Sequence, residues 1–163
     1  KQAESFVKWY SGKRPAVSKV LIFHRSSPST PDTLASDVIT LLRKSDPDIK
    51  IATGTNANFA QLNRNRPGKT GNDFICYSIH PQEHASDNAT LIENLKAQEY
   101  TVKSARRLAN EKELIISPIT LQRRFNANNT FVELPWTGYS IPPQIDSRMM
   151  SLFGACWTAG CLN

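Results

Sequence analysis

Short apolar runs alternate with amphipathic stretches along this chain. Four runs rich in β-branched and aromatic residues predict buried strands at residues 19–24, 48–55, 73–80 and 113–120. Their apolar character is nearly continuous, which is typical of strands in a parallel sheet that is covered on both faces.

Amphipathic helices are predicted between these strands. Residues 30–44 place leucine and valine on one face, with Thr30 as the expected N-cap. Residues 87–110 carry apolar side chains along one stripe and open on Asp87 or Asn88. Both stretches can therefore pack an apolar face against a sheet.

Three further segments complete the prediction. A first helix covers residues 3–10 and is expected to stop at Gly12, and a last helix starts at Asp146 and is apolar nearly all round. The crossover at residues 56–72 is predicted to be a loop or only briefly helical. Helix and strand therefore alternate through most of the chain.

Repeated strand and helix units imply right-handed crossovers and a parallel sheet. Two architectures fit this order: a small doubly wound sheet and part of a (β/α)8 barrel. A whole barrel takes about 250 residues, so a chain of 163 residues cannot close one. The chain begins and ends inside predicted helices. We therefore predict an α/β fold in which residues 1–163 form a single segment of a (β/α)8 (TIM) barrel domain, cut from a longer chain.

Charge and composition narrow the classes of partner. The net charge is +6, but the basic residues are spread out and show no aromatic-interleaved motif, so nucleic acid is not the expected partner. No apolar run reaches the roughly 18 residues of a membrane span, and a cytoplasmic location is expected. The three cysteines, Cys76, Cys156 and Cys161, lie in apolar contexts and are expected to be buried thiols.

Candidate chemistry gathers in the loops that follow the predicted strands. In both architectures, ligands bind at the carboxyl ends of the strands. The loops there hold all three histidines of the chain, His24, His80 and His84, together with many Asn, Gln and Arg residues. We therefore expect the functional site at this edge of the sheet.

The stretch SIHPQEHA has the spacing H-x-x-E-H from His80 to His84, which reads as a zinc-peptidase string. A zinc site of that kind needs a continuous helix, but Pro81 follows the strand directly and turn residues come soon after. The favoured interpretation is a metal-free polar site in which His84, His80 or Glu83 moves protons. Another kind of metal site and surface hydrogen bonding without chemistry stay open as alternatives. We expect no metal and no other cofactor.

The loop at residues 122–145 has no helical or strand period over most of its length. Structureless loops longer than about 15 residues in compact domains are usually functional or disordered. The aromatic residues of this loop, Trp136 among them, favour an ordered lid, and packing over the barrel end for stability alone is the alternative. An apolar wall with converging amides and guanidiniums, such as that of Arg124, suits a polyhydroxylated or carboxylate-bearing small molecule.

Four blocks in consecutive order carry a family resemblance. They are TNANFAQLNRNRP (55–67), YSIHPQEHASDN (77–88), ISPITLQRRFNANNT (116–130) and PPQIDSRMMSLFGACWTAG (142–160). With these blocks the chain resembles the D-apionate lactonase family, enzymes of bacterial branched-sugar catabolism with a central (β/α)8 barrel. The resemblance runs through nearly the whole chain from Lys19 and implies that the chain supplies about strands four to seven of that barrel.

Individual positions either fit or depart from the family's pattern. The family often has Asp in place of Asn56, Asn in place of His80 and an apolar residue in place of Glu83. These departures favour a coincidental H-x-x-E-H string and raise the question of whether the family's substrate is kept. The positions that fit inherit an expected functional role: Asn63, Arg64, Asn65, Arg66, Gln82, His84 and Arg124.

The resemblance implies a carbohydrate-acting hydrolase that opens a sugar-acid lactone such as D-apionolactone. Water would attack the lactone carbonyl with His84 as general base and Glu83 or His80 as its partner. Arg64 or Arg124 would stabilise the developing oxyanion, and asparagines would contact the hydroxyl groups. The expected catalytic residues are His84, Glu83 and His80, and the expected substrate contacts are Asn58, Asn63, Arg64, Arg66, Gln82, Arg124 and Trp136.

Two other classes stay open. A TIM-barrel glycoside hydrolase needs two carboxyl groups beside the sugar, and the strand-end loops offer Glu83, Asp87 and, in the long loop, Glu133. A non-catalytic carbohydrate-binding barrel would bind a sugar without turnover. Half a barrel also exposes two sheet edges, so self-association of this segment is expected.

Overall fold

A computed structural model describes residues 1–81 and 87–120 of the chain. Each predicted strand is confirmed within its predicted span, and the crossover after the second strand holds only a short helix. In chain order the elements are α1 (Gln2–Lys13), β1 (Lys19–Ile22), α2 (Asp32–Ser45), β2 (Lys50–Gly54), α3 (Phe59–Arg64), β3 (Phe74–Ile79), α4 (Asn88–Ala109) and β4 (Glu113–Ile119).

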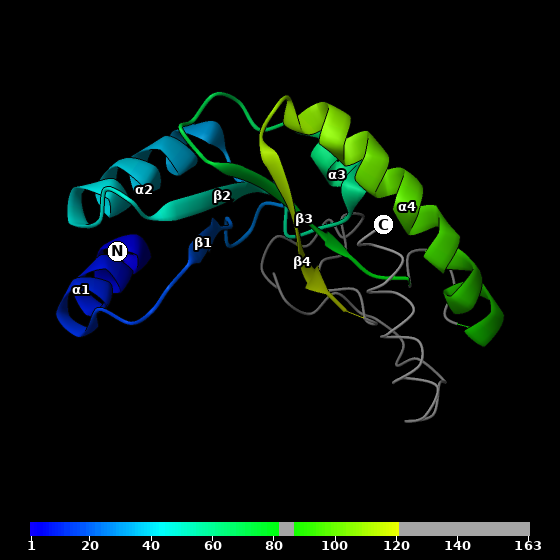
Figure 1. The fold of residues 1–163 in the computed structure, drawn as a ribbon, viewed down its shortest axis with the longest axis horizontal. Helices are drawn as coiled ribbons and strands as arrows, with labels where there is room; N and C mark the ends of the chain where they lie inside the picture. Colours follow the sequence, from blue (N-terminus) through cyan, green and yellow to red (C-terminus); the bar gives the residue numbers. More distant parts are fainter. Residues whose placement is uncertain (82–86, 121–163) are drawn as a thin grey trace.

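The strands form one curled sheet in which sequence order and spatial order agree. The order is β1-β2-β3-β4, and every neighbouring pair is parallel. The helices lie outside the sheet, with α1 and α2 towards one end and α3 and α4 towards the other (Figure 1). This curled half-barrel confirms the predicted partial (β/α)8 barrel. The numbering as strands four to seven and the cut from a longer chain stay predictions.

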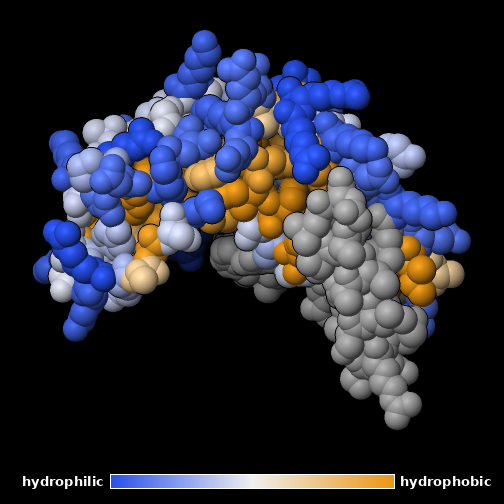
Figure 2. All heavy atoms as spheres, in the orientation of Figure 1, coloured by the Kyte–Doolittle hydropathy of each residue, from blue (hydrophilic) through white to orange (hydrophobic). Residues whose placement is uncertain are grey.

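The sheet separates two apolar layers. Ile51 and Ile75 point towards the helices, where they pack in clusters with residues such as Leu42 of α2 and Leu91 of α4. The alternate positions face the inner side of the curl and form a third cluster around Ala52, Phe74 and Cys76. Figure 2 shows apolar side chains gathered over the middle of the molecule, where the sheet lies, and hydrophilic ones along the helices. The burial of Cys76 confirms one of the three predicted buried thiols.

Two predicted helix boundaries are wrong. The residue before α2 is Pro31, while the hydroxyl of buried Thr30 donates to the carbonyl of Ile22 at 2.7 Å instead of capping the helix. Helix α1 continues through Gly12 to Lys13, and its C-cap, Arg14, has a left-handed φ of 42°. By contrast, the predicted opening of α4 is confirmed, because the Asp87 side chain accepts from the Thr90 amide at 3.0 Å.

Some predictions concern residues 82–86 and 121–163, which lie outside the described part of the chain. The last helix from Asp146, the long loop at residues 122–145 and the burial of Cys156 and Cys161 therefore stay predictions. Among the helices that the structure describes, none is both long and apolar enough to cross a membrane.

Candidate functional site at the carboxyl edge of the sheet

The carboxyl ends of neighbouring strands are joined by backbone hydrogen bonds. The Thr30 amide donates to Gly54 O at 2.9 Å, and the Thr55 amide donates to Cys76 O at 2.9 Å. The Ser78 amide donates to Ala57 O at 3.0 Å. The loops after β1 and β2 are thereby tied to the next strand along the sheet. The edge is a fixed platform for side chains, as a site requires.

Gly54 makes the tightest approach in this platform. Its φ is 153°, and a Cβ built there would lie 2.0 Å from the carbonyl oxygen of Cys76. That same carbonyl accepts the hydrogen bond from the Thr55 amide. A side chain at position 54 would therefore force β2 and β3 apart where the candidate site begins.

Three buried polar atoms at this edge have hydrogen-bonding capacity that no described residue uses. They are Ser29 Oγ, Thr53 Oγ1 and Asn56 Oδ1, in residues that are at most 9% exposed. Buried polar groups are nearly always paired with protein or ordered water. Asn56 drew attention in the sequence only as a departure from the family's pattern. Its burial at a strand end adds it to the candidate site.

His80 follows β3 directly and is 6% exposed. Strand alternation places Ser78 and His80 on the same set of positions as Cys76, which faces the inner side of the curl. The Ser78 hydroxyl donates to the carbonyls of Ala57 and Asn56 at 2.8 and 3.1 Å. His80 therefore lies two positions from Ser78, whose hydroxyl is bound to the loop after β2.

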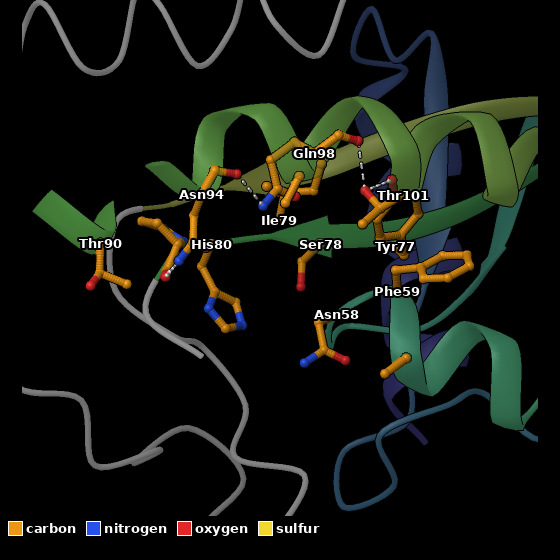
Figure 3. Close-up of a pocket in the computed structure, with 13 residues that line it drawn as sticks. Asn58, Phe59, Tyr77, Ser78, Ile79, His80, Thr90, Asn94, Gln98 and Thr101 are labelled. Carbon is orange, nitrogen blue, oxygen red and sulfur yellow. Dashed lines mark hydrogen bonds between the residues drawn. The ribbon is translucent and has the colours of Figure 1, made fainter. Parts of the chain in front are cut away.

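A pocket of about 320 Å³ lies along β3 between α3 and α4, and we call it the α3–α4 pocket. Figure 3 shows the His80 ring and the Asn58 amide directed towards a common space beneath β3, with Asn94 and Gln98 on α4 above the strand. Its lining residues are Asn58, Phe59, Ala60, Tyr77, Ser78, Ile79, His80, Pro81, Thr90, Asn94, Ala97, Gln98 and Thr101.

Backbone partners orient three amide side chains of this pocket. Asn58 Oδ1 accepts from the Gln61 amide at 3.3 Å and so caps α3. Asn94 Nδ2 donates to Pro81 O at 2.8 Å, and Gln98 Nε2 donates to Asn94 O at 3.2 Å. These partners fix the orientation of each amide, and every one of the three keeps both donor and acceptor capacity, because an amide nitrogen has two N–H groups and an amide oxygen two lone pairs.

The polar stripe of α4 was missed in the sequence. Thr90, Asn94, Gln98 and Thr101 recur at spacings of three and four residues and line the pocket together. The same helix carries an apolar stripe with Leu91 and Val102 buried against the sheet. The sequence signal that could have indicated this stripe is the helical spacing of these polar residues next to an apolar stripe.

The structure brings together only part of the predicted site. Asn58 and His80 line the same pocket. Asn63 and Arg64 are exposed on α3, and neither lines one of the two described pockets. Arg66 donates to Asn63 Oδ1 at 3.2 Å and borders a separate hollow.

That separate hollow is wide, at about 530 Å³, and is formed by the loop after β1 together with Asn65 and Arg66. Asp32 also borders it and accepts a hydrogen bond from the Gly68 amide at 2.9 Å. The guanidinium of Arg66 would attract an anion, but the carboxylate of Asp32 would repel it. The hollow therefore has no clear charge preference.

Five predicted site residues, Gln82, Glu83, His84, Arg124 and Trp136, lie outside the described residues. The zinc and the metal-free interpretations of the H-x-x-E-H string therefore both stay predictions. Within residues 1–81 and 87–120, no group of three or more His, Cys, Asp or Glu side chains is placed to hold a metal ion.

Two titratable groups near this edge have shifted pKa values. The Thr90 amide, which donates to the Asp87 carboxylate, lowers the pKa of Asp87. Burial raises the pKa of the Cys76 thiol to about 12. Asp87 is thus an ionised helix cap and Cys76 a neutral interior thiol, and neither is prepared for acid or base chemistry.

Comparison with known proteins agrees with this architecture. A family described as "D-apionate lactonase, TIM barrel domain" matches residues 3–163. A D-apionate lactonase of Brucella anthropi is 30% identical over 91 residues, which cover 55% of this chain and 15% of that enzyme. No solved structure matches. Because the family match covers nearly the whole chain, this protein belongs to the family of D-apionate lactonase TIM barrel domains.

Proposed function

We propose that this barrel segment is part of a hydrolase that opens a sugar-acid lactone. The family match over residues 3–163 is the observation that carries the proposal. The platform at the carboxyl edge supports it, because this is the edge where TIM barrels bind their ligands. A lactone ring of the D-apionolactone type is the proposed substrate.

In the proposed reaction, water adds to the lactone carbonyl and forms a tetrahedral intermediate. His84 takes a proton from the attacking water, and Glu83 or His80 orients it. A guanidinium, that of Arg64 or Arg124, stabilises the oxyanion. Collapse breaks the ring C–O bond, and the proton passes to the released alkoxide, so that one lactone and one water give one hydroxy acid.

A glycoside hydrolase would need two available carboxyl groups beside the sugar. Among the described residues at this edge, the carboxylates of Asp32 and Asp87 serve backbone amides, those of Gly68 and Thr90 respectively. Because both carboxylates are already bound to backbone amides, these contacts favour the lactonase over the glycosidase.

The test is proton release from a panel of aldonolactones, D-apionolactone included, catalysed by the full-length protein. His84→Ala is expected to lower kcat by about 10²- to 10³-fold or more, comparable to the loss of a principal charge-stabilising or proton-transferring group. The rate is measured with and without a chelator, and hydrolysis is expected to be insensitive to it. Circular dichroism of each variant establishes that the fold is kept.

His80→Asn is the matched variant. It introduces the residue that the family often has at this position, so turnover is expected to change far less than in His84→Ala. Wild-type turnover by His84→Ala would remove the assigned general base. No hydrolysis of any lactone by the wild-type protein would refute the proposal, and the non-catalytic sugar-binding barrel would then take its place.

A further inference from the structure

Helix α4 binds the chain on both sides of residues 82–86. Pro81 comes directly before them and Asp87 directly after them. The Pro81 carbonyl accepts a hydrogen bond from Asn94 Nδ2 at 2.8 Å, and the Asp87 carboxylate accepts one from the Thr90 amide at 3.0 Å. One helix therefore holds both points between which the proposed general base lies in the sequence.

The two points of attachment lie on one face of α4. Asp87 and Asn94 are seven residues apart, which is close to two helical turns, so that about 10 Å of helix separates them at 1.5 Å per residue. The helix has 22 residues and packs on the sheet through buried side chains such as Leu91 and Val102. Both attachments are therefore made to a long, packed element.

The attachment at Pro81 determines the direction of the backbone. The proline ring holds φ near about −65°, and the peptide bond that follows is planar. The remaining dihedral, ψ, sets the direction of the Pro81 carbonyl, and Asn94 holds that carbonyl. Pro81 is also fully buried. One side-chain hydrogen bond thus fixes the direction of the peptide bond that leads into Gln82.

Asn94 belongs to a series of hydrogen bonds that reaches back into β3. Gln98 Nε2 donates to Asn94 O at 3.2 Å, and the Thr101 hydroxyl donates to Gln98 O at 2.8 Å. Because the only hydroxyl hydrogen of Thr101 is used in this way, Tyr77 Oη is the donor in its 3.0 Å contact with Thr101. Figure 3 shows Asn94, Gln98 and Thr101 in sequence along α4. The helix therefore holds β3 at Tyr77 and the chain beyond β3 at Pro81.

We propose that Asn94 is a positioning residue for the lactone hydrolysis. It acts through the Pro81 carbonyl, and it thereby orients the stretch of chain that carries Glu83 and His84. The assignment rests on the proposed function and deepens it by naming the group that orients the general base. A displacement of about 1 Å at a catalytic group can lower the rate by about 10²-fold. A donor that touches no reacting atom is therefore required for full turnover.

Two substitutions remove the donor and keep the size of the side chain. Neither Asn94→Asp at neutral pH nor Asn94→Leu can donate to the Pro81 carbonyl. In the full-length protein, each is expected to lower kcat for D-apionolactone by about 10- to 100-fold. KM is expected to stay within about twofold of the wild type, because orientation is lost and substrate binding is kept. Wild-type kcat, or a raised KM with wild-type kcat, would overturn the proposal.

Gln98→Leu is the matched variant. It removes a second amide that lines the α3–α4 pocket, but the hydrogen bond from Asn94 to Pro81 is kept. A much smaller loss of kcat is therefore expected than in Asn94→Leu. Equal losses in the two variants would mean that the pocket surface matters and the Pro81 contact does not, and the positioning role would be refuted.

Hydrogen–deuterium exchange provides a readout that does not depend on activity. In Asn94→Asp, amides of the peptide at residues 78–90 are expected to exchange at least about tenfold faster than in the wild type, since local opening becomes easier. Peptides from β1 and α2 are expected to keep wild-type exchange. Wild-type exchange at residues 78–90 would contradict the proposal, and faster exchange throughout the chain would reduce Asn94 to a contribution to overall stability.

The two proposals fail in different ways. If the wild-type protein hydrolyses D-apionolactone and Asn94→Asp does so with the same kcat, the lactonase stands and the positioning role fails. If the wild-type protein hydrolyses no lactone, the proposed function fails and takes the catalytic role of Asn94 with it. Faster exchange confined to residues 78–90 in Asn94→Asp would then still establish Asn94 as the anchor of this stretch.

Discussion

The two ends of the sheet use polar residues in opposite ways. At the amino end, the Asp73 carboxylate accepts hydrogen bonds from Arg43 at 3.1 Å, Lys50 at 3.4 Å and the Ile51 amide at 2.9 Å. At the carboxyl end, buried hydroxyl and amide groups include Asn56, whose side-chain oxygen accepts no hydrogen bond from a described residue. Charged groups are paired at the amino end, whereas the carboxyl end holds a polar atom that is not hydrogen-bonded to any described residue.

A second amino-end network repeats this arrangement. Asn72 Oδ1 accepts from Lys112 Nζ at 2.7 Å and from the Thr70 hydroxyl at 2.9 Å, and Asn72 Nδ2 donates to Phe74 O at 2.7 Å. Burial lowers the pKa of Lys112, and the charge of Asp73 opposes that shift. The comparison indicates that the amino end stabilises the barrel and the carboxyl end is available for ligands, the usual division in this fold.

The largest effect on stability is expected from Gly54→Ala at the carboxyl end. The methyl group would lie 2.0 Å from Cys76 O, at a φ of 153° that other residues rarely adopt. We expect unfolding to become easier by roughly 3 kcal/mol or more, measured by urea denaturation of the full-length protein. The control is Gly12→Ala in α1, where no atom lies within 4 Å of an added Cβ. A neutral Gly54→Ala would mean that this edge is not a fixed platform.

A smaller effect is expected at the amino end from Asp73→Asn. The variant can keep the bond from the Ile51 amide but loses the charge that pairs with Arg43 and Lys50. A loss of about 1 to 2 kcal/mol is expected in the free energy of unfolding, because the side chain of Asp73 is only 22% exposed. The control is Asp37→Asn, at an exposed position of α2. Equal effects of the two substitutions would refute a special role for Asp73.

The difference in unfolding free energy between the wild type and Asp73→Asn is expected to depend on pH. Burial would raise the pKa of Asp73, but the Ile51 amide and the Lys50 and Arg43 cations outweigh it and hold the pKa below its ordinary value. A depressed pKa contributes stability above the unfolded value of about 4, and this is lost as pH falls through the folded value. The difference in unfolding free energy between wild type and Asp73→Asn should therefore shrink below about pH 4. A constant difference down to pH 3 would contradict it.

The smallest effect is expected from chemical labelling of Cys76, which lies in the interior between the two ends of the sheet. Its pKa is raised to about 12 by burial, so the thiolate that reacts with iodoacetamide is scarce at pH 8. We expect no labelling of the Cys76 peptide in the native protein and full labelling in urea, as read by mass spectrometry. Rapid native labelling would show that the interior opens readily.

The strands and the parallel order could be predicted from the sequence because buried strands leave a local record. Apolar runs such as residues 73–80 are visible without any tertiary information, and Asp87 marks the start of α4 in the same local way. Thr30 was misassigned because its hydroxyl can either accept from a helix amide, as an N-cap does, or donate to a carbonyl. Its burial beside β1 favours donation to the carbonyl of Ile22.

The candidate site could be predicted only in part. His80 and Asn58 were both predicted from their positions after strands and line one pocket, since the carboxyl ends of parallel strands meet at one edge, and their functional role stays a prediction. Strand-end position alone did not distinguish Arg66, which borders another hollow. It also did not indicate Asn94 and Gln98, which come from a helix farther along the chain.

The sequence alone determined the alternation of elements and the family, because each depends on residue type and order along the chain. Only the tertiary structure decided that Asn94 and Gln98 of α4 line one pocket with Asn58 and His80. That arrangement depends on distances between segments remote in sequence and on hydrogen bonds already made elsewhere, neither of which has a local signature.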